Sequence, residues 1–341
     1  MNLSELQKTA KALVAPGKGI IAMDESAPTI AKRFKKVGIE DNVDNRRAYR
    51  ELLLSTPELS KYISGAILYD ETIRQSTGDG MAFAKYMERL GIIPGIKVDK
   101  GTKDLAHFPD EKVTEGLDGL RERLSEYRGM GARFAKWRAT IAIGPSIPTA
   151  FCLEANAHAL ARYAALCQEQ DIVPIVEPEV LIDGNHTLEQ CYDASVATLR
   201  AVFRQLAEHR VAYEGTILKA SMVISGLEAS KRAGVDDVAD ATVRCLLNTV
   251  PAALPGVVFL SGGQGTEEAT AHLNAMNARY PKLPWPLTFS YSRALQQPVM
   301  ETWKGNAAHS GAAQKQLQRR ARFNSLAATG KYQAQMEREA A

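Results

Sequence analysis

Short apolar runs alternate with longer amphipathic stretches along most of this sequence. A short apolar run bounded by turn residues is typical of a buried strand. Eight such runs predict strands, at residues 19–25, 65–70, 93–99, 133–139, 173–179, 215–220, 256–262 and 287–292. Between them, apolar residues recur at spacings of three and four, which is typical of amphipathic helices. The clearest of these helices are predicted at residues 153–169, 187–208, 237–250 and 266–279.

The alternation of strands and helices predicts parallel strands joined by right-handed helical crossovers. Eight such units favour a closed (β/α)8 TIM barrel, with extra helices at the N-terminus and at residues 305–328. An open, doubly wound sheet is the alternative. The sequence contains no low-complexity segment and no obvious linker. We therefore expect a single domain over residues 1–341, with a short C-terminal tail from about residue 330.

Composition and charge indicate which partners and which compartment to expect. The 341 residues are 45% hydrophobic and 24% charged, with a net charge of +3, which is too small to favour nucleic acid or an anionic membrane as partner. Four scattered cysteines without CxxC spacing indicate reduced thiols. The N-terminal segment lacks the apolar core of a signal peptide, and no run has the length of a membrane span. We expect a cytoplasmic protein that binds neither nucleic acid nor membrane.

One predicted strand carries two cations where apolar residues are expected. In GARFAKWRATIAIG, residues 131–144, the side chains of Phe134, Lys136 and Arg138 share one face, because strand residues alternate. Burying two cations on one face is costly unless anionic groups meet them. The sequence therefore predicts carboxylates, or an anionic substrate, opposite this strand.

Polar and charged residues end most of the other strands too. In a (β/α)8 barrel these ends converge at the C-terminal mouth, where the active sites of this fold lie. A single lysine there often reaches solvent, and a buried ion-pair network without chemistry is a second alternative. Their recurrence on most strands favours a catalytic site. The residues concerned are Asp24, Lys97, Asp99, Lys136, Arg138, Glu177, Glu179, Lys219, Ser261 and Arg293.

Lysines and carboxylates in one apolar mouth are typical of Schiff-base chemistry. A lysine becomes a useful nucleophile where desolvation and a neighbouring cation favour its neutral form. Lys219 follows the apolar run GTIL and could have Lys136 across the barrel. Dehydration of a carbinolamine needs a carboxyl group that exchanges protons, and Glu177 or Glu179 could serve. The resulting iminium would accept electrons from an adjacent carbon–carbon bond as it breaks.

The last two strands predict a phosphate site. SGGQG, residues 261–265, leads into a helix, and its glycines let backbone N–H groups approach an anion, although glycine turns often only turn. Arg293 begins the next helix. A basic cluster at 26–33 follows the first strand and has a solvated helix face as its alternative explanation. The histidines lack metal-ligand spacing and no GxGxxG follows a strand, so we expect no metal and no cofactor.

The motifs IIAMDES, GIKVDKG, GLDGLRERL, FAKWR, ANAHALARYA, IVPIVEPE, FLSGGQ, LTFSY and RALQ occur in this order. With them, the sequence resembles the class I fructose-bisphosphate aldolases from about residue 3 to residue 332. GIKVDKG, FAKWR, VPIVEPE and FLSGGQ together are highly specific. The resemblance implies a TIM barrel that needs no metal, cleaves fructose 1,6-bisphosphate reversibly through a lysine Schiff base and assembles as a homotetramer.

The resemblance also implies roles for individual residues. Lys219 corresponds to the Schiff-base lysine, Glu177 to the acid/base that dehydrates the carbinolamine, and Asp24 to the group that takes the C4 hydroxyl proton. Lys136 corresponds to a charge-stabilising lysine beside them, and Glu179 would complete the network. The predicted substrate- and phosphate-binding residues are Arg138, Ser261, Gly262, Gly263, Ser292, Arg293, Ser26, Thr29, Arg33 and Lys97.

Three features depart from the family pattern. Ala220 and Ser221 follow the lysine where proline and asparagine are common, and Ser292 stands where glycine is usual. The chain ends in QMEREAA without the terminal tyrosine that helps proton exchange in many members, and Tyr332 matches only the start of that tail. Two other functions are considered, namely a preference for sedoheptulose 1,7-bisphosphate and a non-catalytic barrel scaffold.

Overall fold

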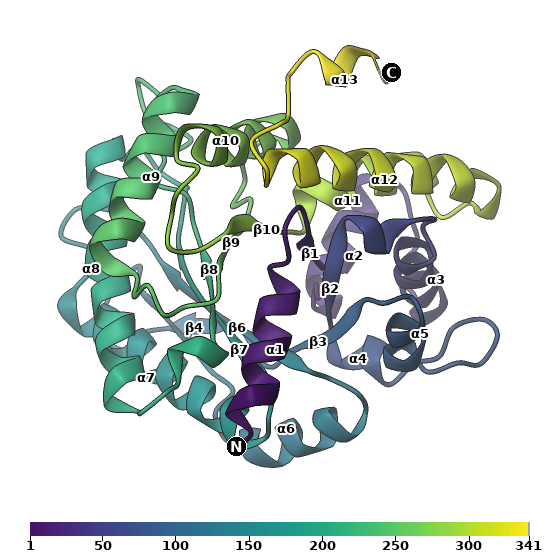
Figure 1. Ribbon diagram of the computed structural model, residues 1–341, viewed down its shortest axis with the longest axis horizontal. Coiled ribbons are helices and arrows are strands. Elements are labelled where there is room, and N and C mark those ends of the chain that lie inside the picture. The colour runs from purple at the N-terminus through teal and green to yellow at the C-terminus, as the bar shows by residue number, and fades with distance from the viewer. Residues whose placement is uncertain (340–341) are drawn as a thin grey trace.

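Eight parallel strands close into a barrel in the computed structural model, which describes residues 1–339 (Figure 1). The first strand pairs with the second on one edge and with the last on the other. The open-sheet alternative is therefore wrong, and the (β/α)8 barrel is confirmed. The barrel strands are Gly19–Ala22 (β1), Ile63–Leu68 (β2), Ile93–Lys97 (β3), Phe134–Ile141 (β6), Val173–Val180 (β7), Ile217–Ala220 (β8), Val257–Phe259 (β9) and Leu287–Tyr291 (β10).

Helices surround the strands and cover the outer face of the barrel (Figure 1). Along the chain, the segment between β3 and β6 forms an antiparallel hairpin of β4 (Thr102–Asp104) and β5 (Lys112–Thr114). This hairpin was not predicted from the sequence. The α-helices are Leu3–Leu13 (α1), Ala27–Lys36 (α2), Val43–Leu54 (α3), Asp70–Ile73 (α4), Phe83–Arg89 (α5), Leu120–Gly129 (α6), Ala150–Glu169 (α7), Leu188–Glu208 (α8), Val235–Thr249 (α9), Thr266–Arg279 (α10), Arg293–Trp303 (α11), Ser310–Ala327 (α12) and Met336–Glu339 (α13).

Predicted and observed boundaries differ at several strand ends. β1 stops at Ala22, so Asp24 lies in the loop after the strand and not within it. The helix expected at 305–328 begins at Ser310, after a 3₁₀ turn at Ala307–His309. The tail after residue 330 contains the short helix α13. None of the helices in the described residues 1–339 combines the length and hydropathy that a membrane crossing needs.

Apolar side chains fill the interior of the barrel toward the N-terminal ends of its strands. Phe134 on β6, Ile217 on β8 and Val258 on β9 belong to one buried cluster inside it, together with Leu6 and Leu13 of α1. Helix α1 therefore closes the N-terminal end of the barrel, across which it lies in Figure 1. Because one end is closed by apolar contacts, polar side chains that point inward further along the strands gather at the opposite end.

Strand β6 shows how alternation separates the two environments. Phe134 points into the barrel, whereas Trp137 belongs to the outer cluster and stacks on Tyr163 of α7 with ring centroids 5.6 Å apart. Lys136 and Arg138 share the inner face with Phe134, as the pattern predicted, and lie nearer the C-terminal end. The same alternation that builds the core thus delivers two cations to the mouth.

Candidate active site

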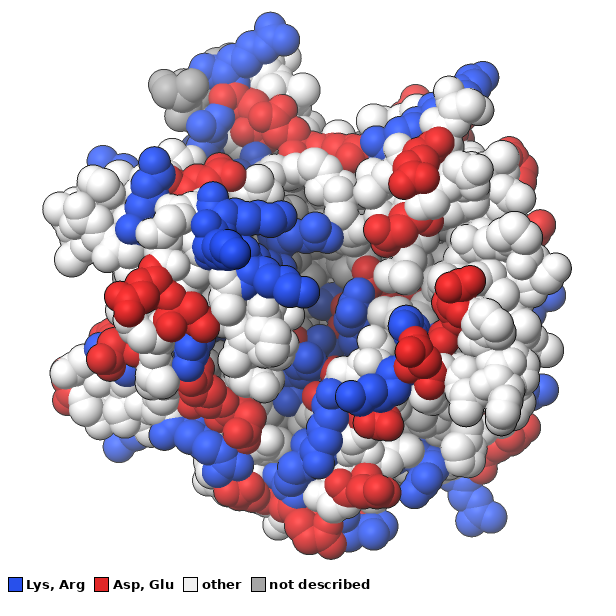
Figure 2. All heavy atoms as spheres, turned by 180° about the vertical axis from the view of Figure 1, so that it is seen from behind, with Lys and Arg blue, Asp and Glu red and all other residues white. Residues whose placement is uncertain are grey.

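A pocket of about 450 Å³ opens at the C-terminal end of the barrel. On this face, opposite α1, Lys and Arg side chains gather around a hollow (Figure 2). The clustering explains how a chain with a net charge of only +3 can present a basic site. The pocket is lined by Ala22, Asp24, Glu25, Ser26, Thr29, Lys32, Arg33, Lys36, Lys97, Lys136, Arg138, Glu177, Glu179, Lys219, Leu260, Ser261, Gly262, Ser290, Ser292 and Arg293.

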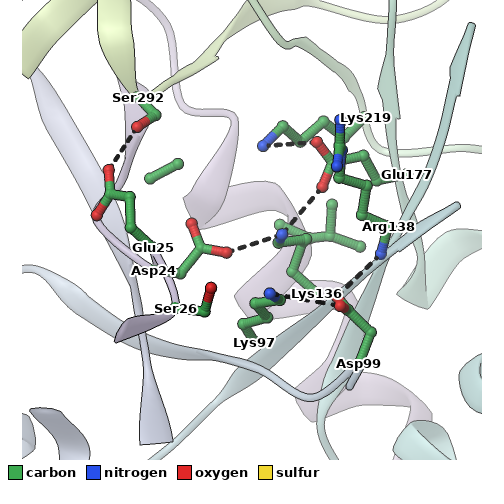
Figure 3. A network of polar contacts seen from close by, with 12 residues as sticks. Asp24, Glu25, Ser26, Lys97, Asp99, Lys136, Arg138, Glu177, Lys219 and Ser292 are labelled. Atoms are coloured by element: carbon green, nitrogen blue, oxygen red, sulfur yellow. Dashed lines mark hydrogen bonds and ion pairs between the residues drawn. The ribbon is translucent and has the colours of Figure 1, made fainter. Parts of the chain in front are cut away.

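Two carboxylates meet Lys136 at the centre of the pocket (Figure 3). Its Nζ lies 2.7 Å from Oδ2 of Asp24 and 3.3 Å from Oε2 of Glu177. The other oxygen of Glu177, Oε1, lies 3.0 Å from Nζ of Lys219. All four side chains are at least nine-tenths buried. Glu177 therefore bridges the two lysines, and Asp24 faces them from the loop after β1.

Two further ion pairs flank this centre. Arg138 pairs with Glu179 on the neighbouring strand β7. Nζ of Lys97 lies 3.5 Å from Oδ1 of Asp99, whose other oxygen accepts a hydrogen bond from the backbone N–H of Arg138. The cations of β6 are thus met by carboxylates from β7 and from the loop after β1, as the sequence predicted.

Charge attraction keeps the central carboxyl groups ionised. Burial alone would raise the pKa of Asp24, but attraction to Lys136 and Lys219 outweighs burial and lowers that pKa well below its usual range. The same balance, with the same two lysines, lowers the pKa of Glu177. Burial alone would lower the pKa of Lys136, but Asp24 and Glu177 raise it. The centre therefore holds ionised groups at neutral pH.

The loop after β9 has the geometry of an anion site. Gly262 and Gly263 have φ of 57° and 111°, a region that favours glycine, and the loop leads into α10. The guanidinium of Arg293 lies beside this loop, since a Cβ built on Gly263 would be in ordinary contact with its Nη2 at 3.5 Å. Ser261 and Gly262 line the pocket. Gly263 supports the loop beside Arg293 without being part of the pocket wall.

The basic cluster after β1 also faces the pocket. Ser26 is the N-cap residue of α2, and its Oγ lies 3.1 Å from Oγ1 of Thr29. Arg33, one turn further on, lies 2.5 Å from Oε1 of Glu25. All of these residues line the pocket, so this face of the helix is directed toward the pocket. The substrate-binding roles predicted for them remain predictions.

Sequence reasoning missed several side chains of the pocket. Glu25 is buried and pairs with Arg33 and Arg50, although it stands directly after Asp24 in AMDES. Lys32 and Lys36 also line the pocket. Their spacing of four residues on a helix puts them on one face, so the run KRFKK, residues 32–36, was a usable signal. A helix face was considered for the cluster at 26–33, but its direction toward the pocket was not predicted.

The described part of the tail lies away from the pocket. The hydroxyl of Tyr332 lies 3.2 Å from Oε1 of Glu337 in α13, and Glu337 pairs with the buried Arg320 of α12. No tail residue up to 338 is among those that line the pocket. Likewise, within residues 1–339 no three His, Cys, Asp or Glu side chains are grouped as metal ligands.

The chain is similar to known aldolases over nearly its whole length. Residues 5–341 match the family model described as "Glycolytic: Fructose-bisphosphate aldolase class-I". The "Probable fructose-bisphosphate aldolase class 1" of Xanthomonas campestris is 63% identical over 97% of this chain and 99% of its own length. The "Fructose-bisphosphate aldolase, cytoplasmic isozyme" of Spinacia oleracea is 50% identical over 96% and 92%.

A solved structure extends the likeness to three dimensions. The fructose-bisphosphate aldolase of Plasmodium falciparum, in a complex with TRAP and a small-molecule inhibitor, superposes with a TM-score of 0.96. It is 48% identical and covers 97% of this chain and 96% of its own. These comparisons support neither a heptulose bisphosphate preference nor a non-catalytic scaffold. Together, the closed barrel, its charged mouth and the full-length match show that the chain belongs to the class I fructose-bisphosphate aldolase family.

Proposed function

We propose that this aldolase cleaves fructose 1,6-bisphosphate to dihydroxyacetone phosphate and glyceraldehyde 3-phosphate through an imine on Lys219. The observation that carries the assignment is the contact between the buried side chains of Lys219 and Glu177, with Nζ 3.0 Å from Oε1 at the bottom of the pocket. A buried amine beside a carboxylate has both a nucleophile and a proton acceptor in place.

The first stage forms the imine. Glu177 accepts a proton from the Lys219 ammonium as the amine attacks the C2 carbonyl, and a proton shift from nitrogen to oxygen gives the carbinolamine. Glu177 then returns its proton to the carbinolamine hydroxyl, which leaves as water. The protonated imine remains on Lys219. Lys136 stays charged throughout, because its pKa is raised by Asp24 and Glu177, and it stabilises the negative charge on both carboxylates.

The second stage breaks the C3–C4 bond. Asp24 accepts the proton of the C4 hydroxyl, the bond electrons move into the imine to form an enamine, and the aldehyde product leaves. Asp24 is suited to this role because its pKa is held low by Lys136 and Lys219, so it is ionised when substrate binds. Protonation of the enamine and hydrolysis of the imine release dihydroxyacetone phosphate.

The two phosphates bind at opposite ends of the mouth in this proposal. Ser261, the backbone of Gly262 and the guanidinium of Arg293 take the ketose-side phosphate, beside the N-terminus of α10. The side chains after β1, together with Lys97 and Arg138, take the other one. Support comes from their placement on the pocket wall. Two basic ends around one carbonyl site suit a bisphosphate better than a neutral sugar.

We further propose that residues 1–341 form one catalytic domain and that it works in the cytosol as a homotetramer without a cofactor. The names of relatives in Spinacia oleracea ("cytoplasmic isozyme") and Arabidopsis thaliana ("cytosolic") support the compartment. The homotetramer is proposed because the resemblance to class I aldolases implies it. Unchanged activity after dialysis against EDTA is expected, and a loss that zinc restores would contradict the metal-free reaction.

Borohydride trapping tests the assignment directly. The protein is incubated with dihydroxyacetone phosphate, reduced, digested and analysed for the added mass. In the wild-type protein we expect the adduct on Lys219. Lys219→Ala should give neither an adduct nor turnover. The matched Lys136→Ala variant should still give its adduct on Lys219. An adduct on another lysine, or none on folded wild-type protein, would overturn the proposal.

A further inference from the structure

The cations of the pocket differ in whether they already have a carboxylate partner. Lys136 and Lys219 share Glu177, Arg138 has Glu179, and Arg33 has Glu25. In the described part of the chain, Arg293 makes no ion pair, although it lies in the same pocket. An arginine without an anionic partner is available for a phosphate, whereas an arginine bound to a carboxylate has a placement that its partner determines.

The hydroxyl of Ser292 contacts the carboxylate of Glu25 (Figure 3) and the guanidinium of Arg33. It donates to Oε1 of Glu25 at 2.6 Å and accepts from Nη1 of Arg33 at 2.9 Å. Nε2 of Gln296 lies 3.2 Å away, but its two hydrogens have closer acceptors in the carbonyl of Ala22 and Oε1 of Glu25. A serine hydroxyl has one hydrogen to donate and two lone pairs. The single hydrogen is used by Glu25, so this side chain has no hydrogen left for a phosphate.

Glu25 is the anchor of this cluster. Its second oxygen, Oε2, pairs with Arg50 of α3, and Gln296 of α11 donates to Oε1 at 2.9 Å and to the carbonyl of Ala22 at 2.6 Å. The carboxylate is thus tied to the end of β1, to α3 and to α11. Ser292 adds the connection through which Arg33, on α2, is held to the start of α11.

Arg33 and Arg293 are close enough to affect each other. Burial lowers the pKa of Arg293, and the charge of Arg33 lowers it further. Two guanidinium groups in one pocket repel, so a fixed separation requires groups that hold one of them in place. Glu25 and Ser292 are the groups that hold Arg33. Arg293 then remains free to meet the anion.

We propose that Ser292 is a positioning residue: its hydroxyl holds Arg33 against Glu25 and so builds the binding end for the second phosphate before substrate arrives. This inference rests on the proposed function and refines it, because Ser292 acts through Arg33 and not as a phosphate ligand of its own side chain. If the hydroxyl turned toward a phosphate, it would leave the Glu25 carboxylate facing that phosphate without its hydrogen bond, which is unfavourable.

Steady-state kinetics with two substrates test this role. Fructose 1,6-bisphosphate carries both phosphates, whereas fructose 1-phosphate lacks the one that Arg33 would bind. In Ser292→Ala, we expect KM for the bisphosphate to rise about tenfold, the value of one charge-assisted hydrogen bond. We expect the KM for fructose 1-phosphate to rise less than about twofold, and kcat for either substrate to fall much less than KM rises.

Three further variants separate the alternatives. Ser292→Thr keeps the hydroxyl and should restore the wild-type KM. In an Arg33→Ala background, Ser292→Ala should add little, because the two residues act as one unit. An equal rise in KM for both substrates, or additive effects with Arg33→Ala, would overturn the proposal. Failure of the function itself is distinguishable, since wild-type protein would then give no borohydride adduct on Lys219.

Discussion

The Nζ of Lys219 lies 3.0 Å from Oε1 of Glu177, on the neighbouring strand of the barrel. The other oxygen of this carboxylate faces a second lysine, Lys136, at 3.3 Å. One carboxylate therefore contacts both the proposed nucleophile and a cation that keeps it ionised. Proton transfer to and from Lys219 therefore depends on this shared carboxylate.

Glu177→Gln should abolish most of the turnover while leaving the fold intact. The amide keeps the size of the side chain but neither accepts a proton from Lys219 nor returns one to the carbinolamine. We expect kcat to fall by about 10²–10⁴, the contribution typical of a general acid/base. Rapid-quench borohydride trapping should show slower formation of the Lys219 adduct. Adduct formation at the wild-type rate would remove Glu177 from this step.

Asp24→Asn should separate imine formation from bond cleavage. Glu177 and Lys219 keep their contact, so the adduct with dihydroxyacetone phosphate should still form. Cleavage of fructose 1,6-bisphosphate should fall by about 10²–10⁴ because no carboxylate accepts the C4 hydroxyl proton. Trapping and cleavage assays on the same preparation measure the two effects. Loss of both in parallel would indicate a disturbed pocket rather than a missing base.

The ion pairs of Glu25 with Arg50 and Arg33 should make the protein less stable in acid. Burial alone would raise its pKa, but Arg50 and Arg33 outweigh burial and lower it from 4.5 to about 2. Between these values the unfolded chain binds a proton that the folded chain does not, so the free energy of unfolding falls as the pH falls through this window. Urea unfolding between about pH 5 and about pH 3 measures the slope.

Glu25→Gln is the control for this effect. It removes the titrating group, so the dependence of stability on pH in the same window should become shallower. It should also lower stability at neutral pH by about 3–5 kcal/mol, since Arg50 is then buried without its anion. An unchanged slope would show that other carboxyl groups dominate the acid response.

The tail should matter for stability and not for turnover. Truncation after Tyr332 removes Glu337 and leaves the buried Arg320 without its carboxylate. Because the guanidinium can then be reached by water, we expect a modest loss of about 1–2 kcal/mol in the free energy of unfolding. Since no described tail residue lines the pocket, kcat should stay within about twofold of wild type. A large fall in kcat would place the tail in the reaction.

Gly95 on β3 packs directly against the ring of Phe134 inside the barrel. A Cβ at this position would lie 2.2 Å from Cζ of Phe134 on the next strand. Gly95→Ala should therefore lower the free energy of unfolding by about 1–3 kcal/mol, the usual range for overpacking. The matched substitution Gly129→Ala in α6 meets no atom within 4 Å and should be neutral or stabilising. Equal effects of the two would contradict the packing argument.

Sequence periodicity determined the architecture, and the resemblance to the family's motifs pointed to the central residues. Eight apolar runs alternating with amphipathic helices specified a barrel, because each strand must be buried on both faces. Two-residue periodicity put Lys136 and Arg138 on one face, and motif order pointed to Lys219, Glu177 and Asp24. These features are local, so they can be predicted without knowing which strands are neighbours.

The tertiary structure decided which charges pair and which remain available. The sequence did not show that Glu177 bridges two lysines, or that Glu25 binds Arg33, Arg50 and Ser292 together. Those contacts join residues up to 267 positions apart, and they depend on barrel closure and on the rotation of α2 and α11 about their axes. Periodicity specifies the inward face of each element, but the pairing of charges depends on how the elements pack together.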